Sequence, residues 1–180
     1  MKKSYHPALS MKVIPLILFA NLLLNLFPLY ADDAPRRILF SGFTWHDKEK
    51  LDNGTELNSY NLGIGYERDY FKEYKKLYYT YHVMLINDSN RHPYLYLAGS
   101  KSFRFHHRLI DTSVGIAGFV GIKNMRHDDG DYHYSPIVGL APTASVYMGD
   151  LTLNFSYVPG MNFGPYTTIA FLYMYVGWEF

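Results

Sequence analysis

The 180-residue sequence contains no cysteine, so no disulfide bond holds it together. It also lacks an excess of charge of one sign, because the formal net charge is only +1. Nucleic-acid-binding domains carry a basic patch or stripe, so nucleic acid is not an expected partner. The length fits one domain, and aromatic residues are abundant, with 18 tyrosines and 12 phenylalanines.

Residues 1–31 have the pattern of a secretory signal peptide. Three lysines precede the uncharged run 13–31, which ends in the small residue Ala31. The alternative is a retained transmembrane helix, since a run of this length can just span a bilayer, but two prolines within it disfavour a helix. Cleavage would leave a mature domain, residues 32–180, with 14 basic and 16 acidic residues.

Hydrophobic residues after about Ile38 alternate with a period of two, as in strands. In the final segment one face is entirely apolar, while the other carries Tyr173, Tyr175 and Glu179. Strands with one apolar face and an aromatic C-terminal residue are typical of a transmembrane β-barrel. The mean hydropathy of −0.14 agrees, because alternation hides the lipid-facing residues from an average.

The pattern predicts an all-β fold: an eight-stranded antiparallel transmembrane β-barrel. The expected strands are 38–46, 60–68, 77–87, 94–105, 109–123, 137–147, 151–158 and 168–180. A soluble barrel of the lipocalin kind is the alternative. The apolar outward faces, with Tyr and Trp near the strand ends, favour the membrane barrel.

This topology brings three candidate catalytic residues to one rim of the barrel. His46 ends the first expected strand, and Asp88 and Ser89 follow the third. Those strands are two places apart, or roughly 10 Å between axes, so the side chains could converge. A hydroxyl, a base and a carboxylate are the groups that acyl transfer uses. The simpler interpretation is that Asp88 and Ser89 only form a turn and that His46 is a rim residue.

Five short motifs point to one known family. They are TWH (44–46), DKEK (47–50), NDS (87–89), LAPTASV (140–146) and YVPG (157–160). In this order and spacing they resemble the outer-membrane lipid A palmitoyltransferase family, PagP, from about Arg37 to Phe180.

The resemblance implies a cofactor-free and metal-free acyltransferase in the Gram-negative outer membrane. Such enzymes move a palmitoyl chain from a glycerophospholipid donor to lipid A of lipopolysaccharide. The family's essential residues correspond to His46, Asp88 and Ser89, and a lysine linked to lipopolysaccharide recognition corresponds to Lys50. We expect a monomer, and we expect His46 to act as the general base with Asp88 tuning or positioning it.

The resemblance also implies a route and a pocket for the acyl chain. Prolines that open a lateral gate correspond to Pro142 and Pro159, and proline cannot donate to a strand ladder. The floor of the acyl pocket corresponds to the region of Gly99, Ser100 and Lys101.

The sequence departs from the family pattern in three places. The N-terminal amphipathic helix is apparently absent, since few residues separate the expected cleavage site from Ile38. Ser41 and Ser59 stand where a second gap in the wall would have prolines, so lipid access would rely on the other side. Lys101, if it points inward, would pair with Asp111 and shorten the pocket.

Other polar features receive simpler interpretations. His106 and His107 fall in a turn, and residues 124–134 form a loop whose His and Asp residues lack the spacing of a metal site. Lys123 and Arg126 are candidates to contact lipopolysaccharide phosphates. The competing functions are a non-enzymatic small barrel, in adhesion or barrier integrity, and an outer-membrane phospholipase.

Overall fold

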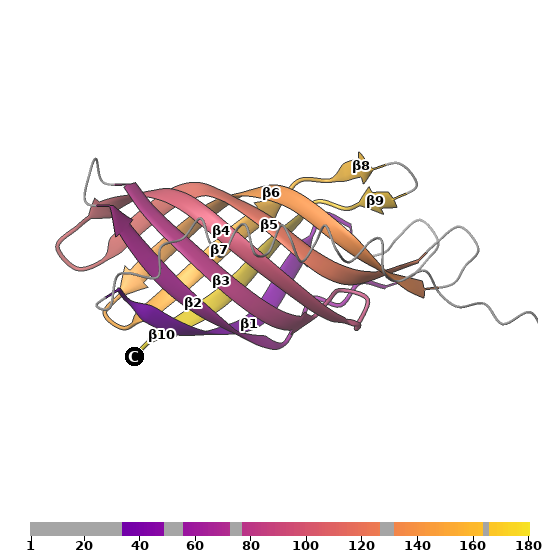
Figure 1. Cartoon of the computed structure of the whole chain (residues 1–180), viewed down its shortest axis with the longest axis horizontal. Coiled ribbons are helices and arrows are strands. Elements are labelled where there is room, and N and C mark those ends of the chain that lie inside the picture. Colours follow the sequence, from indigo (N-terminus) through magenta and orange to yellow (C-terminus); the bar gives the residue numbers. More distant parts are fainter. Residues whose placement is uncertain (1–33, 49–55, 73–76, 127–131, 164–165) are drawn as a thin grey trace, which may run out of the picture. The chain divides into compact units, whose positions relative to one another are not determined.

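The structure is a computed structural model that describes residues 34–48, 56–72, 77–126, 132–163 and 166–180. The expected signal segment 1–31 lies outside these residues. Figure 1 shows strands wound into a barrel, which closes in the order β1-β10-β7-β6-β5-β4-β3-β2, every neighbouring pair antiparallel. The prediction of an eight-stranded antiparallel barrel is therefore confirmed.

The barrel strands match the predicted segments to within five residues, and β5 and β6 extend into the segment 124–134 that was predicted as a loop. Their bounds are β1 (Arg36–His46), β2 (Gly63–Lys72), β3 (Leu77–Asn87), β4 (Pro93–His106), β5 (Asp111–Arg126), β6 (Tyr132–Met148), β7 (Leu151–Val158) and β10 (Phe171–Glu179).

Two predicted strands begin later than the alternation indicated. The strand predicted at 60–68 is β2, which begins at Gly63, because the residues before it bond to β1 and to the β3–β4 turn. The strand predicted at 168–180 is β10, which begins at Phe171. A separate hairpin, β8 (Met161–Phe163) with β9 (Tyr166–Thr168), precedes it and was not predicted. No helix long and apolar enough to cross a membrane occurs among the described residues.

The outer face of the barrel is apolar. Large hydrophobic side chains exposed there include Phe40, Trp45, Ile64, Leu85, Leu95, Phe103, Val114, Ile116, Val138, Leu140 and Trp178. An apolar outer face of this extent fits lipid, not water. Alternate residues of the same strands point into the barrel.

A β-bulge at Gly42 reverses the alternation within β1. The pairing of β1 with β10 shifts between Ser41 and Phe43, so Gly42 is an extra residue. Before the bulge Arg37, Leu39 and Ser41 are buried, whereas after it Thr44 and His46 are. Bulges commonly re-aim side chains next to functional sites. Here the bulge turns His46 into the barrel.

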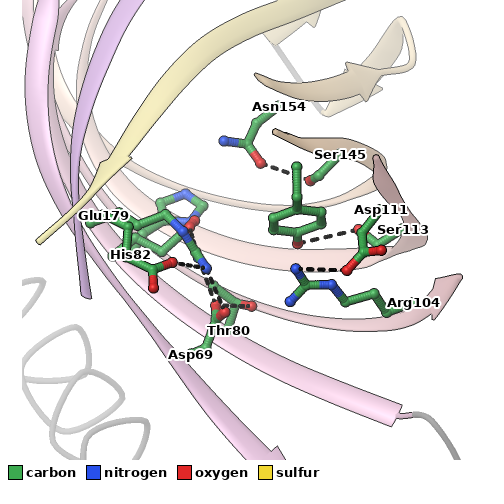
Figure 2. A network of polar contacts seen from close by, with 12 residues as sticks. Asp69, Thr80, His82, Arg104, Asp111, Ser113, Ser145, Asn154 and Glu179 are labelled. Atoms are coloured by element: carbon green, nitrogen blue, oxygen red, sulfur yellow. Dashed lines mark hydrogen bonds and ion pairs between the residues drawn. The ribbon is translucent and has the colours of Figure 1, made fainter. Parts of the chain in front are cut away.

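The lower interior, at the end of the barrel where β1 begins, is held by a buried charge network. Arg37, only 1% exposed, bonds to Glu67 at 2.9 Å and to Asp69 at 2.8 and 3.0 Å. It also reaches Glu179 at 3.2 Å. Figure 2 shows this network, in which the Thr80 hydroxyl donates to Asp69 at 3.1 Å. Arg37 therefore connects β1 both to β2 and to β10, the last strand.

Replacing Arg37 with methionine should destabilise the barrel by about 3–5 kcal/mol, because Glu67 and Asp69 would remain buried without their counter-charge. Unfolding by urea in lipid vesicles measures the difference. The control is Lys101→Met, which removes an exposed lysine whose only described contact is the Tyr79 ring, 5.7 Å away; it should change stability by less than about 1 kcal/mol. Equal stability of Arg37→Met and the wild type would contradict a structural role for the network.

Gly65→Ala should destabilise the fold by about 1–3 kcal/mol, as overpacking does. A Cβ atom there would collide with the Val83 carbonyl oxygen and the Met84 side chain. Gly42→Ala is the matched control, because no atom lies within 4 Å of a Cβ atom at Gly42. The same unfolding measurement should place Gly42→Ala within about 0.5 kcal/mol of the wild type, and a similar cost for both variants would refute the packing explanation.

Candidate functional site

His46 and Ser89 meet at the rim where β1 and β3 end. His46 is the last residue of β1 and is 8% exposed, and its Nε2 atom lies 2.7 Å from the Ser89 Oγ atom. The predicted convergence of these two residues is confirmed. A hydroxyl within hydrogen-bond distance of an imidazole is the geometry in which the ring can accept the hydroxyl proton.

The β3–β4 turn presents Ser89 through bonds made by Asp88. The Asp88 Oδ1 atom accepts from the backbone N–H groups of Asn90 and His92, both at 2.9 Å. Its backbone bonds to His92 and Arg91 at 2.8 and 2.9 Å, and Arg91 adopts the left-handed conformation with φ 64°. Asp88 is thus the residue that fixes the turn, as the simpler interpretation of the sequence had it.

No hydrogen bond or ion pair joins Asp88 to His46 among the described residues, so the two side chains are not in direct polar contact. The other Asp88 oxygen, Oδ2, is buried, accepts no hydrogen bond from the described part of the chain, and faces the Lys123 Nζ atom at 3.5 Å. Asp88 is only 3% exposed. Asp88 is therefore linked to the site through the turn that carries Ser89 and through its ion pair with Lys123.

Below this rim the barrel encloses an apolar cavity that opens at the site. Aliphatic and aromatic side chains supply most of its wall: Ile86, Tyr94, Tyr96, Ala98, Ala117, Phe119, Ala141, Val158, Phe171 and Tyr173. Asp88, Ser89 and Lys123 also line it. Such a cavity, apolar in depth with a few polar groups, suits a ligand with a long apolar part and a polar end.

A second, polar cavity lies deeper in the barrel. His82 and Ala117 line both cavities, and the lower wall includes Glu67, Ser102 and Asn154. His82 Nδ1 lies 3.6 Å from Glu67 Oε2, so His82 stands between the apolar cavity and the charged network. The apolar cavity therefore ends at the level of His82 and Ala117.

The residues expected at the pocket floor do not lie together inside the barrel. Ser100 lines the polar cavity only, while Lys101 is exposed, next to the Tyr79 ring, and Gly99 lines neither described cavity. The alternation of β4 explains this arrangement, because its even-numbered residues point inward. The expected Lys101–Asp111 pair is not formed. Asp111 instead pairs with Arg104 and His106, at 3.4 and 2.9 Å.

The wall has an open edge between β6 and β7. The two strands pair only between Thr143–Met148 of β6 and Leu151–Ser156 of β7. Among the described residues, the part of β6 from Tyr132 to Pro142 therefore pairs with β5 alone. Pro142 stands at the first position beyond the pairing, and Pro159 directly follows the end of β7. Both expected gate residues therefore flank an unpaired stretch.

The β1–β2 side is closed by polar bonds. Pairing of β1 with β2 stops at Ser41 opposite Gly63, but the residues before β2 continue the contact. Thr44 N donates to Ser59 O at 2.8 Å, and Ser41 Oγ donates to Asn61 O. The Asn61 side chain donates to Thr44 Oγ1 at 2.6 Å. Ser41 and Ser59, where the family resemblance would put prolines, thus make the hydrogen bonds that join β1 to the segment before β2.

Several predicted residues fall outside this description. Lys50 and residues 127–131 lie outside the described residues, and for Arg126 only the backbone is described. Among the residues that are described, no group of three or more His, Cys, Asp or Glu is arranged to hold a metal ion.

Sequence reasoning missed Asn61, whose amide reaches Ser89 Oγ at 3.3 Å. No motif marked it, because it lies in an irregular segment before β2. Lys123 was predicted only to contact lipopolysaccharide phosphates. Its odd residue number in β5 places it on the same inward face as Ser113 and Ala117.

Comparison with known proteins identifies the family. The sequence model of the family described as "Antimicrobial peptide resistance and lipid A acylation protein PagP" matches residues 30–175. None of the curated proteins matches the chain. Among solved structures, the outer membrane protein Ail of Yersinia pestis, in a phospholipid bilayer nanodisc, is similar at 12% identity and a TM-score of 0.42, covering 82% of this chain and 100% of its own; that likeness is too weak to carry a conclusion. Because the family match spans most of the sequence, the chain belongs to the PagP family.

Proposed function

We propose that the protein is an outer-membrane acyltransferase that moves a palmitoyl or similar chain from a glycerophospholipid to lipid A of lipopolysaccharide. The observation that carries this proposal is the 2.7 Å contact of His46 Nε2 with Ser89 Oγ at the mouth of an apolar cavity. Membership of a family described by lipid A acylation supports the acceptor, and the apolar outer face supports a membrane location.

The proposed chemistry is an ester exchange with His46 as the general base. His46 Nε2 takes the proton of an attacking hydroxyl, which is either that of Ser89 or that of lipid A. The hydroxyl oxygen then bonds to the ester carbonyl carbon of the donor. Collapse of the tetrahedral intermediate breaks the bond to the glycerol oxygen, which receives the proton from the imidazolium. If Ser89 attacks first, a second cycle passes the acyl group to lipid A. The exchange changes no oxidation state, so it needs no redox cofactor.

Asp88 and Lys123 support this chemistry by position. Asp88 holds the turn that carries Ser89, and Lys123 places a positive charge 3.5 Å from Asp88 at the cavity mouth. A cation there would stabilise the oxyanion that forms at the ester carbonyl. The same lysine, with Lys50, is suited to contact lipid A phosphates if this rim faces the cell exterior.

The acyl chain would enter sideways through the open edge between β6 and β7. A lipid in the outer leaflet meets that edge beside Pro142 and Pro159, where strand pairing is absent. The β1–β2 seam offers no comparable opening, because bonds from Ser41 and Thr44 join it. Inside, the chain would fill the apolar cavity down to His82 and Ala117.

Replacing Ser89 with alanine should leave a folded barrel and lower acyl transfer about 10²–10⁴-fold, because the hydroxyl held against His46 is lost. The measurement is the lipid A mass spectrum of cells that express each variant, in which transfer adds one acyl chain. Asn90→Ala is the control, because only its backbone N–H bonds to Asp88. Full transfer by Ser89→Ala would mean that Asp88 and Ser89 serve only to form the β3–β4 turn.

The same cells separate this function from its rivals. Release of free fatty acid without acylated lipid A would indicate a phospholipase, and an unchanged lipid profile under inducing conditions would indicate a non-enzymatic barrel. Radiolabelled phospholipid then tests the intermediate, since label bound covalently to Ser89 supports an acyl-enzyme. Transfer without such label supports direct attack by lipid A.

Ala117→Leu should shorten the transferred chain, because the larger side chain would fill the lower end of the apolar cavity. The mass of the acylated lipid A reports the chain length one methylene at a time. Gly118→Ala is the matched control. It adds a methyl group beside the Leu140 side chain, at an ordinary contact distance of 3.5 Å, on a residue that lines neither described cavity. An unchanged chain length with Ala117→Leu would mean that the chain ends elsewhere.

A further inference from the structure

Asn61 is a buried polar residue at the site that the proposed chemistry does not use. It is 4% exposed and precedes β2, on the seam that joins β1. Its Nδ2 atom donates to Thr44 Oγ1 at 2.6 Å and to Ser89 Oγ at 3.3 Å. Asn61 therefore contacts the same hydroxyl oxygen as His46, from the segment that precedes β2.

The direction of the Asn61 amide is set by a chain of bonds that begins at the backbone. The N–H group of Tyr60 donates to Asn58 Oδ1 at 3.1 Å, and a backbone N–H can only donate. The opposite end of the Asn58 amide, Nδ2, therefore donates to Tyr60 O at 2.6 Å and to Asn61 Oδ1 at 3.3 Å. With its Oδ1 atom accepting that bond, Asn61 must turn its Nδ2 donors toward Thr44 and Ser89.

This direction determines what the Ser89 hydroxyl can do. Because Ser89 Oγ accepts from Asn61, its own proton is free to point to His46 Nε2, 2.7 Å away. His46 then accepts at Nε2, which is the form of the ring that a general base needs. Were the Asn61 amide reversed, its oxygen would compete with His46 for the Ser89 proton.

We propose that Asn61 is a positioning residue that fixes the proton order of the Ser89–His46 pair, and that Asn58 sets Asn61 in turn. The catalytic part of this inference rests on the proposed function, whereas the hydrogen-bond order is a property of the folded protein alone. The two can therefore be tested separately.

The test uses Asn61→Asp, which keeps the shape but replaces the donor with an acceptor, and Asn58→Asp, which does not touch the Ser89 side chain. In Asn58→Asp a carboxylate oxygen would face Asn61 Oδ1, and their repulsion should turn the Asn61 amide over. Both variants should move the Ser89 proton away from His46. Nitrogen NMR of the His46 ring, in the full-length folded protein, should then show that Nε2 no longer accepts a hydrogen bond from Ser89.

In acyl transfer with purified lipids, both variants should lower kcat about tenfold with little change in KM. Ser41→Ala is the matched control, because it removes the bond to the Asn61 backbone oxygen and leaves the Asn61 side chain in place. It should keep the wild-type His46 signal and kcat.

Three results decide the inference. An unchanged His46 signal in both aspartate variants would overturn it, and so would a loss of kcat in Ser41→Ala equal to theirs, since the seam alone would then explain the effect. If the His46 signal changes as expected but the wild type transfers no acyl chain, the proposed function fails and the positioning by Asn61 stands.

Discussion

One buried cation bridges the seam at which the barrel closes. Arg37 lies at the seam where the first and last strands meet, and it binds carboxylates from the strands on both sides, Glu67 and Asp69 on one and Glu179 on the other. A buried charge in this position is tolerated only because its partners are buried with it. Removing any one member of the network would therefore leave a buried charge without one of its partners. The buried charged residues of this network lie in the lower interior. The cavity above them is lined mainly by apolar side chains, as the proposed acyl-chain pocket requires.

The functional site sits on the opposite side of that division, and it is built from turn chemistry. One carboxylate oxygen of Asp88 accepts two backbone hydrogen bonds within its own turn, and that turn places Ser89 Oγ 2.7 Å from His46 Nε2. The turn interpretation and the proposed catalytic interpretation of Asp88 and Ser89 are therefore compatible. In the proposed chemistry, the residue that forms the turn also positions the Ser89 hydroxyl. A carboxylate in contact with the histidine ring, as in hydrolase triads, is not part of it.

The sequence predicted the strands from period-two alternation and the nearness of His46 and Ser89 from antiparallel strand order. It did not predict the bulge that turns His46 inward, nor the contacts that depend on strand register or on irregular backbone. The direction of Lys101 was ambiguous until the register of β4 was known, and the role of Asn61 depends on a segment without periodicity. The partner of Asp111 was also missed, since Arg104 reaches it from the inward face of β4. Long-range side-chain contacts of this kind leave no periodic signal.

The bulge at Gly42 has a consequence for how such a strand can change its length. Arg37 and His46 are separated by an odd number of positions, so a regular strand would place one of them in the lumen and the other in the lipid. Both face inward only because one residue is left out of the pairing. Within β1, therefore, the number of residues between Arg37 and His46 has a fixed parity. While the bulge is kept, losing or gaining a single paired residue exposes one of the two to hydrocarbon, whereas a change of two preserves both.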